Sequence, residues 1–308
     1  MNDFDRTLYA TVLEVVADWP PPAPGTDVSA APDFPGHWAT AVRLGWTGVL
    51  DGADLAAEPD PDLIDSAVGA VEALGRAGVP LPVRQTLVAR YAAGDRAPEE
   101  SRGPDGVLVH PTAYGVWAPG ATGLDLAGRP CAVGAGGAGG DPAEDDTPRT
   151  GELARLLLLA ELLGAADGAI REARRYVEER VQFGRPLIRI PAVRTSLGEA
   201  AVAHRGMAAA VREAQRRFRV PAAVDGADRS LRFALTGARA VAAEAVGRIA
   251  AVAHQLHGAM GITGEAGLHR RTTLLWAGRD EGLVGRDWGL AELPDAEEEL
   301  WDLTAPVG

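Results

Sequence analysis

Lysine is absent from the sequence, and all 30 basic residues are arginines. This absence excludes Schiff-base chemistry, pyridoxal enzymes and phosphate-binding loops that need a lysine. The one cysteine, Cys131, cannot form an internal disulfide or a thiol-rich metal site, and its Gly- and Pro-rich surroundings offer no base to activate a thiol. His254 and His257 are three residues apart, but no third ligand follows at a suitable spacing, so we predict no metal site.

Long apolar runs and an excess of positive charge are also missing. The most apolar stretch is interrupted by Arg155, Glu161, Asp167 and Arg171, so no membrane span is predicted. The formal net charge of −13 argues against a general nucleic-acid binder, because phosphate contacts need a basic surface. Residues 1–6 lack a basic region followed by an apolar one, so we expect a cytoplasmic protein without a secretory signal.

Aromatic residues make up only 5% of the chain, whereas alanine and leucine are abundant, which favours helices. We therefore predict a mainly α protein with an N-terminal helical domain at 1–97, a reduced β or loop region at 98–150 and a C-terminal antiparallel four-helix bundle at 151–308. Helical periodicity predicts helices over residues 6–18, 38–46, 61–76, 83–93, 151–182, 191–217, 228–257 and 268–280, and a tail at 291–304.

The middle region is rich in prolines, glycines and acidic residues. Short strands are predicted there at residues 106–110, 113–117 and 129–133. Residues 134–139 match the Gly-x-Gly-x-x-Gly spacing of dinucleotide loops, but the acidic, helix-poor residues 140–146 that follow would repel a phosphate. We therefore expect a flexible loop here rather than a nucleotide site.

One long predicted helix ends in the run Arg180-Val181-Gln182-Phe183-Gly184-Arg185-Pro186-Leu187. Gly184 and Pro186 stop the helix, which leaves Arg180 at its C-terminal end with an aromatic ring three residues on. Such an arginine can hold an anion that carries a ring. Alternatively, Arg180 complements the helix dipole and pairs with Glu178 or Glu179.

This run resembles the C-terminal domain of the acyl-CoA dehydrogenases, through Arg180, Phe183, Gly184 and the helix start Pro191-Ala192-Val193-Arg194. Pro191 stands where the family usually has a glutamine that meets the flavin nucleotide, so one contact of the set is lost.

A second likeness lies about seventy residues further on, in the run Gln255-Leu256-His257-Gly258-Ala259-Met260-Gly261. It is similar to the family's Gln-x-x-Gly-Gly-x-Gly segment, with Ala259 in place of the second glycine. The two runs have the order and separation of the family. The resemblance covers residues 151–290 well and the N-terminal third loosely, and it implies an acyl-CoA dehydrogenase-like fold.

In members of that family both runs touch FAD that is held mainly by a neighbouring subunit, with the arginine near the pyrophosphate. The resemblance therefore implies FAD as the cofactor. The FAD contacts that it implies in this chain are Arg180, Gln182, Phe183, Leu187, Gln255, Leu256, Gly258 and Ala259. Gly258 and Gly261 also fit a plain helix end, and the two interpretations can coexist.

The reaction of the family needs a carboxylate that removes an α-proton of the acyl-CoA while a hydride leaves the β-carbon for the flavin. The family keeps this glutamate in one of two places. The first corresponds here to Ala154, which is no acid, and the second to Gly282, one residue after Glu281. Glu281 is thus the candidate catalytic base. Alternatively, Asp280 and Glu281 are solvated acids at a helix end.

Complete members of the family hold a larger β-domain in place of residues 98–150, and this reduction argues against an independent flavin site. The chain resembles the short partner in α2β2 heterotetrameric steroid-CoA dehydrogenases. We therefore predict a subunit that contributes FAD contacts across an interface to a full-length partner, with an acyl-CoA substrate such as a steroid side-chain CoA thioester. The alternatives are a self-sufficient homo-oligomeric dehydrogenase that uses Glu281, and a helical scaffold without a cofactor.

Overall fold

The computed structural model describes residues 3–20, 25–93, 123–131 and 148–282. The α-helices of these ranges are α1 (Asp3–Val16), α2 (Phe34–Arg43), α3 (Pro61–Ala77), α4 (Val83–Ala93), α5 (Pro148–Glu179), α6 (Pro191–Phe218), α7 (Ala227–His257) and α8 (His269–Gly282). The short 3-10 helices are η1 (Val28–Ala30), η4 (Leu187–Arg189), η5 (Gly258–Ile262) and η6 (Gly264–Ala266). The mainly α fold is therefore confirmed, and each helix that periodicity predicts is present, α4 with the predicted ends and the others with shifted ends.

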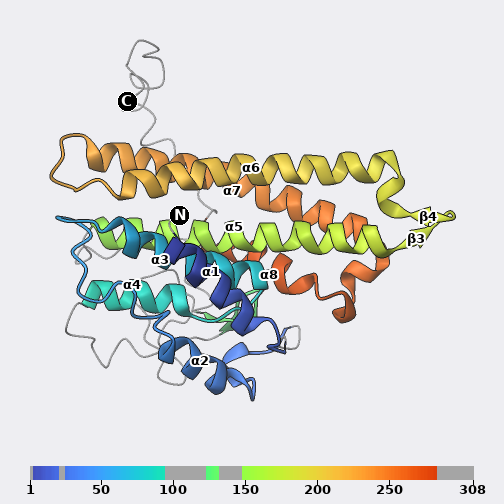
Figure 1. The fold of residues 1–308 in the computed structure, drawn as a ribbon, viewed down its shortest axis with the longest axis horizontal. Helices are drawn as coiled ribbons and strands as arrows, with labels where there is room; N and C mark the ends of the chain where they lie inside the picture. Colours follow the sequence, from blue (N-terminus) through green and yellow to red (C-terminus); the bar gives the residue numbers. More distant parts are fainter. Residues whose placement is uncertain (1–2, 21–24, 94–122, 132–147, 283–308) are drawn as a thin grey trace, which may run out of the picture.

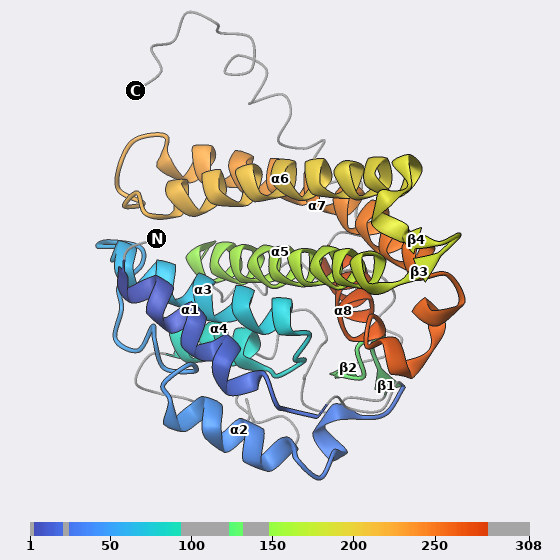
Figure 2. The same ribbon diagram turned by 45° about the vertical axis from the view of Figure 1, so that its right-hand side comes forward.

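Helices α5, α6 and α7 lie along the long axis of the molecule and run alternately in opposite directions, and the shorter α8 packs against α5 and α7 (Figures 1 and 2). Together they form the predicted antiparallel bundle. Helix α3 packs along the face of α5 that α6 and α7 leave uncovered, α1 packs against α3, and α4 contacts both α5 and α3. Helix α5 is thus the central element, because helices from both ends of the chain cover it.

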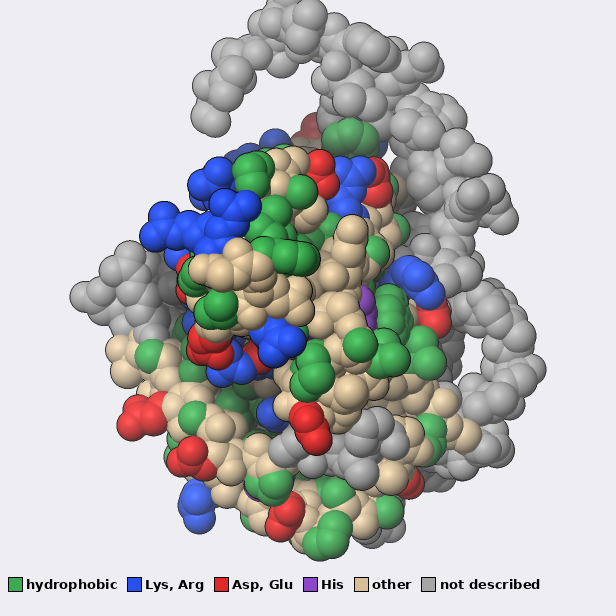
Figure 3. Space-filling model, turned by 90° about the vertical axis from the view of Figure 1, so that its right-hand side faces the viewer, with side chains coloured by type: hydrophobic (Ala, Val, Ile, Leu, Met, Phe, Trp, Pro, Cys, Tyr) green, Lys and Arg blue, Asp and Glu red, His purple; other side chains and the backbone are tan. Residues whose placement is uncertain are grey.

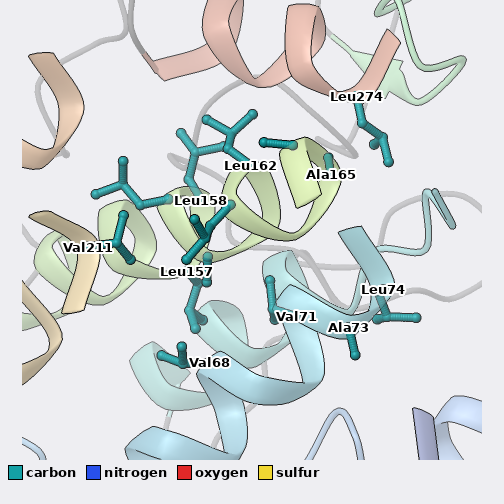
Figure 4. Packing of buried hydrophobic residues seen from close by; sticks show 14 of the residues in the cluster. Val68, Val71, Ala73, Leu74, Leu157, Leu158, Leu162, Ala165, Val211 and Leu274 are labelled. Atoms are coloured by element: carbon teal, nitrogen blue, oxygen red, sulfur yellow. The ribbon is translucent and has the colours of Figure 1, made fainter. Parts of the chain in front are cut away.

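The buried side chains explain why α5 holds this position. An apolar run of α5 is buried nearly all round, as expected for a helix with neighbours on every side. Figure 4 shows Leu157, Leu158, Leu162 and Ala165 of this helix surrounded by side chains from three others. The surrounding residues labelled there are Val68, Val71, Ala73 and Leu74 of α3, Val211 of α6 and Leu274 of α8. The predicted N-terminal domain and C-terminal bundle therefore share one hydrophobic core.

Three glycines allow α3 and α5 to approach closely. A Cβ atom on Gly164 would overlap the carbonyl oxygen of Glu72, and one on Gly75 would overlap that of Glu161. On Gly168 a Cβ would overlap the carbonyl oxygen of Arg76. Only glycine fits at these crossings, because the opposing atoms belong to rigid helix backbone.

The described β-structure consists of two short antiparallel hairpins. Strand β1 (Gly123–Leu124) pairs with β2 (Pro130–Cys131), which corresponds to the strand predicted at 129–133. Strand β3 (Val181–Gln182) pairs with β4 (Arg185–Pro186) directly after α5. The strands predicted at 106–110 and 113–117, the glycine run 134–139 and the tail at 291–304 lie outside the described residues.

The end of α5 corrects one prediction. The helix predicted to reach residue 182 ends at Glu179, and the chain turns back through Phe183 and Gly184, whose φ angles are 53° and 72°. Two successive residues with positive φ form the kind of tight turn that fits a β-hairpin.

Among the helices of the described ranges, none combines the length and apolarity that a membrane crossing requires.

Candidate functional site

A pocket of about 420 Å³ opens where α5 ends, α6 begins and α7 ends. The β3–β4 hairpin and η4 reverse the chain between α5 and α6, so the first turns of α6 come back beside the last turns of α5. Helix α7 runs parallel to α5 and brings its C-terminus to the same end (Figure 1). The lining residues are Tyr176, Arg180, Gln182, Leu187, Ala192, Val193, Ser196, Gln255, Leu256, His257, Gly258, Ala259 and Met260.

The structure brings most of the predicted cofactor residues together in this pocket. We call it the cofactor pocket. Those that line it are Arg180, Gln182, Leu187, Gln255, Leu256, Gly258 and Ala259. The two sequence runs are therefore neighbours in space, although about seventy residues separate them. Figure 3 faces this end of the molecule, and basic side chains gather on part of that face.

Phe183 is the predicted cofactor residue that does not line the pocket. It lies at the tip of the β3–β4 hairpin, where 86% of its surface is exposed. An aromatic side chain with positive φ and so much exposure has no packing role within the described part of this chain. Its predicted contact with FAD is not tested by this position.

Arg180 is held by its main chain and leaves its side chain available. Its N–H donates to the carbonyl oxygen of Tyr176 at 2.8 Å, and its own carbonyl accepts from the N–H of Leu187 at 2.9 Å. No ion pair involves its guanidinium within the described ranges, and Glu178 accepts instead from Arg174 Nε at 2.8 Å. A fixed backbone with an exposed, unpaired guanidinium suits the binding of an external anion.

The N-terminus of α6 adds further positive character to the pocket. The helix begins with Pro191, and no side chain caps its first turn. Ala192, Val193 and Ser196 of this first part line the pocket. Because the N–H groups of a first turn have no partner within the helix, they attract anions. Pro191, at the position of the family's glutamine, has a ring in place of the amide side chain.

Gly258 ends α7 in a conformation that favours glycine, with φ 57° and ψ −138°. Its N–H closes the helix on the carbonyl oxygens of Gln255 and His254. A Cβ atom at this position would meet no atom within 4 Å, so the backbone faces open space on the pocket side. The helix-end role and an open approach for a ligand thus coexist, as the sequence suggested.

Two aromatic residues of the pocket were missed by sequence reasoning. The buried ring of His257 stacks on Tyr176 with a centroid distance of 4.5 Å, and its Nδ1 lies 2.8 Å from the carbonyl oxygen of Ala253. Because a carbonyl only accepts, Nδ1 carries a proton, and in the neutral ring Nε2 is left as an acceptor. The signal was available, since Tyr176 lies one helical turn before Arg180 and His257 lies inside the second run.

Glu281 lies elsewhere, in a buried ion network. Its carboxylate accepts from Arg84 Nη2 at 2.7 Å and lies 3.6 Å from Arg129 Nη2, and its side chain is 1% exposed. Arg129 also pairs with Glu161 at 3.1 Å and with Asp125 at 2.7 Å. The expectation of a solvated acid is therefore wrong for Glu281, because α4, α5 and the β1–β2 hairpin enclose it. Its role as a base stays a prediction.

The cofactor pocket fits the phosphate-bearing part of a dinucleotide better than its ring. Its cationic and donor groups are Arg180, the first turn of α6 and the glycine end of α7. Exposed residues form most of its wall, so it is open on one side in the isolated chain. A ligand bound here would therefore be contacted by this chain on one side only.

Comparisons with known proteins identify a family and relatives that this chain resembles. The family described as "Acyl-CoA dehydrogenase, C-terminal domain" matches residues 150–283. Acyl-CoA dehydrogenase IpdE2 from Mycobacterium tuberculosis is 32% identical over 122 residues, which cover 40% of this chain but only 35% of that relative's length.

Two solved structures share the fold over nearly their full length. The structure named "Tcur3481-Tcur3483 steroid ACAD" variant has a TM-score of 0.67 at 21% identity and covers 96% of this chain and 98% of that chain. The ChsE4-ChsE5 complex from Mycobacterium tuberculosis has a TM-score of 0.60 at 18% identity and covers 100% and 99%. At these identities the likeness establishes the fold.

Proposed function

We propose that this chain is a subunit of an FAD-dependent acyl-CoA dehydrogenase. Its residues 150–283 match the acyl-CoA dehydrogenase C-terminal domain. In this role it supplies one wall of an FAD site whose remainder belongs to a full-length partner subunit. One observation carries the proposal, namely the meeting of Arg180, the start of α6 and the Gln255–Gly258 end of α7 in one open pocket.

The residues of this chain would bind and orient the cofactor. Arg180 offers a planar, permanently charged donor group to a pyrophosphate, and the first-turn N–H groups of α6 add to it. Gln255 is exposed beside the glycine end and offers an amide. When bound, FAD would supply the acceptor for the hydride that leaves the β-carbon of an acyl-CoA.

The partner is proposed to supply the catalytic base. In this chain the position of the family's first glutamate is Ala154, which is buried. Glu281, next to the second position, is bound by Arg84 and Arg129 in a network that does not reach the cofactor pocket. A carboxylate engaged by two guanidinium groups, with a side chain 1% exposed, is not accessible to an external substrate in the described part of the chain.

The names of similar proteins support a heteromeric assembly and a steroid-type substrate. The similar ChsE4-ChsE5 structure is a complex of two proteins, and the similar Tcur3481-Tcur3483 structure is named as a steroid ACAD. We therefore infer an α2β2 assembly that acts on a CoA thioester, with a steroid side chain as the leading candidate for the acyl group.

The test is to purify the chain alone and together with a full-length acyl-CoA dehydrogenase subunit from the same genome, and to measure bound FAD in each sample. We expect no FAD in the chain alone, and FAD together with acyl-CoA-dependent flavin reduction in the co-purified complex. A flavin-containing, active preparation of the chain alone would establish the self-sufficient alternative. A complex whose FAD content and activity equal those of the partner alone would leave this chain as a scaffold.

A further inference from the structure

A second pocket, of about 390 Å³, lies between the segment that follows α1, the turn between α3 and α4, and the start of α8. It shares no lining residue with the cofactor pocket. We name it the N-terminal pocket. Its lining residues are Trp19, Pro20, Thr26, Asp27, Val28, Ala30, Ala31, Pro32, Asp33, Phe34, His37, Val79, Pro80, Leu81 and Arg270.

The walls of the N-terminal pocket are mainly apolar and aromatic. The Trp19 ring stacks on His37 with a centroid distance of 4.0 Å and an angle of 7°. Phe34, which is 4% exposed, stacks on Trp38. The turn between α3 and α4 contributes the buried side chains of Val79 and Leu81. Flat, supported aromatic walls favour a ligand with a ring or a short apolar chain.

The ionisable groups that line this pocket are two carboxylates, Asp27 and Asp33, the imidazole of His37 and the guanidinium of Arg270. Asp27 Oδ1 accepts from the N–H and the hydroxyl of Ser29, at 2.8 and 2.7 Å. Burial lowers the pKa of His37, although Asp33 opposes this, so the imidazole is neutral near pH 7. Asp33 is exposed at the mouth and is solvated. The remaining group is the guanidinium of Arg270.

Arg270 is a partly buried cation that makes no ion pair within the described part of the chain, although the charge of Glu172 acts on it from a distance. Its Nε is buried and makes no hydrogen bond, whereas Arg271 beside it donates to the carbonyl oxygen of Arg76 at 2.9 Å and lies 3.5 Å from Glu172. Arg270 also belongs to the first turn of α8, where the helix dipole disfavours a positive charge. An anion placed here would relieve both penalties.

We infer that the N-terminal pocket binds a small amphipathic carboxylate. The apolar body, an aromatic ring or a short aliphatic chain, would lie against Trp19, Phe34 and Leu81, and the carboxylate would pair with Arg270. The volume is near the lower end of small-molecule sites, about 300 to 1,000 Å³, so the ligand is far smaller than a CoA thioester. The inference does not depend on the proposed FAD site.

The test uses the full-length chain and calorimetric titration with 1-naphthoate and its uncharged analogue 1-naphthamide. Naphthoate is expected to bind, and Arg270→Ala should weaken its binding about tenfold or more while leaving naphthamide binding unchanged. Arg279→Ala is the matched control, because it removes a charge from the exposed end of the same helix, and it should leave both affinities unchanged.

A second variant keeps the test decisive if Arg270→Ala fails to fold. Ala31→Trp places a large side chain at a half-exposed lining position and should abolish the binding of both probes. The inference is overturned if naphthoate does not bind the unaltered chain, if Arg270→Ala binds it as tightly, or if Ala31→Trp has no effect. FAD content of the assembled complex should be unchanged by Arg270→Ala, which separates this outcome from a failure of the proposed function.

Discussion

Arg129 and Arg180 use the same guanidinium group in opposite ways. Arg129 is fully buried and is surrounded by Asp125, Glu161 and Glu281, so its charge stabilises the contact between the β1–β2 hairpin and the helices. Arg180 is exposed, with a fixed backbone and no described ion pair. A buried guanidinium must be neutralised within the chain, whereas an exposed one is free to bind a ligand.

Glu161→Gln tests the buried network. The substitution removes the carboxylate that pairs with both buried arginines, while Asp125 and Glu281 remain, so the free energy of unfolding should fall by about 1–3 kcal/mol. Glu244→Gln is the control, because Glu244 pairs with Arg248 on the surface, and the loss should be about 0–1 kcal/mol. Equal losses in urea unfolding of the two variants would contradict the structural role of the network.

Comparing the unaltered chain with Glu161→Gln also tests how stability depends on pH. Burial opposes ionisation of Glu161, but Arg129 and Arg84 outweigh it and hold its pKa below the ordinary value of 4.5. A carboxylate with a lowered pKa in the folded state contributes stability above pH 4.5, and this contribution is lost as the pH falls through the folded-state pKa. The stability difference between the unaltered chain and Glu161→Gln should therefore shrink below pH 4.5, and a constant difference would count against this assignment.

Among the helices, the contact between α3 and α5 depends on glycine. Gly164→Ala would place a methyl group on the carbonyl oxygen of Glu72 and should lower the free energy of unfolding by about 1–3 kcal/mol. Gly237 in α7 faces open space, so Gly237→Ala should stabilise the isolated chain by roughly 0.5–1 kcal/mol. Thermal unfolding of both variants checks the prediction, and a neutral Gly164→Ala would show that the two helices can separate at little cost.

Periodicity predicted the helices because their apolar faces recur at helical spacing. Asp60 caps α3 through its side chain. The hairpin after α5 was missed, because Arg180 to Gln182 still fit a helical pattern and the turn depends on the φ angles of Phe183 and Gly184. The glycine contacts of α3 with α5 could not be predicted, since they depend on which helices meet. The ion-pair network around Glu281 joins segments that are far apart in the sequence, so no local sequence pattern could predict it.

The cofactor pocket was more predictable than its surroundings. The two motifs predicted that Arg180 and Gly258 contact the same ligand. The fold brings both residues into one pocket. The sequence positions of Tyr176 and His257 could have indicated that both lie at the pocket, but their stacking could not be predicted, because it depends on how α5 and α7 align.

In the molecule as a whole, the cofactor pocket sits at one end of the bundle and is open outward. The exposed Phe183 lies beside it on the hairpin, and Ile262, which is 84% exposed, follows the glycine end of α7. Apolar side chains around a polar pocket are typical of a surface that a partner covers. We therefore expect the pocket to be completed only in the assembled protein.

The measurement that tests this account most directly is the FAD dissociation constant of the assembled complex with Arg180→Ala, compared with Arg185→Ala. Arg185 is an exposed arginine of the same hairpin that does not line the cofactor pocket. Loss of a charge-assisted hydrogen bond of about 1.5–3 kcal/mol corresponds to an affinity about 10- to 100-fold weaker. We predict that loss for Arg180→Ala and an unchanged affinity for Arg185→Ala. Unchanged FAD affinity in the Arg180→Ala complex would contradict the account.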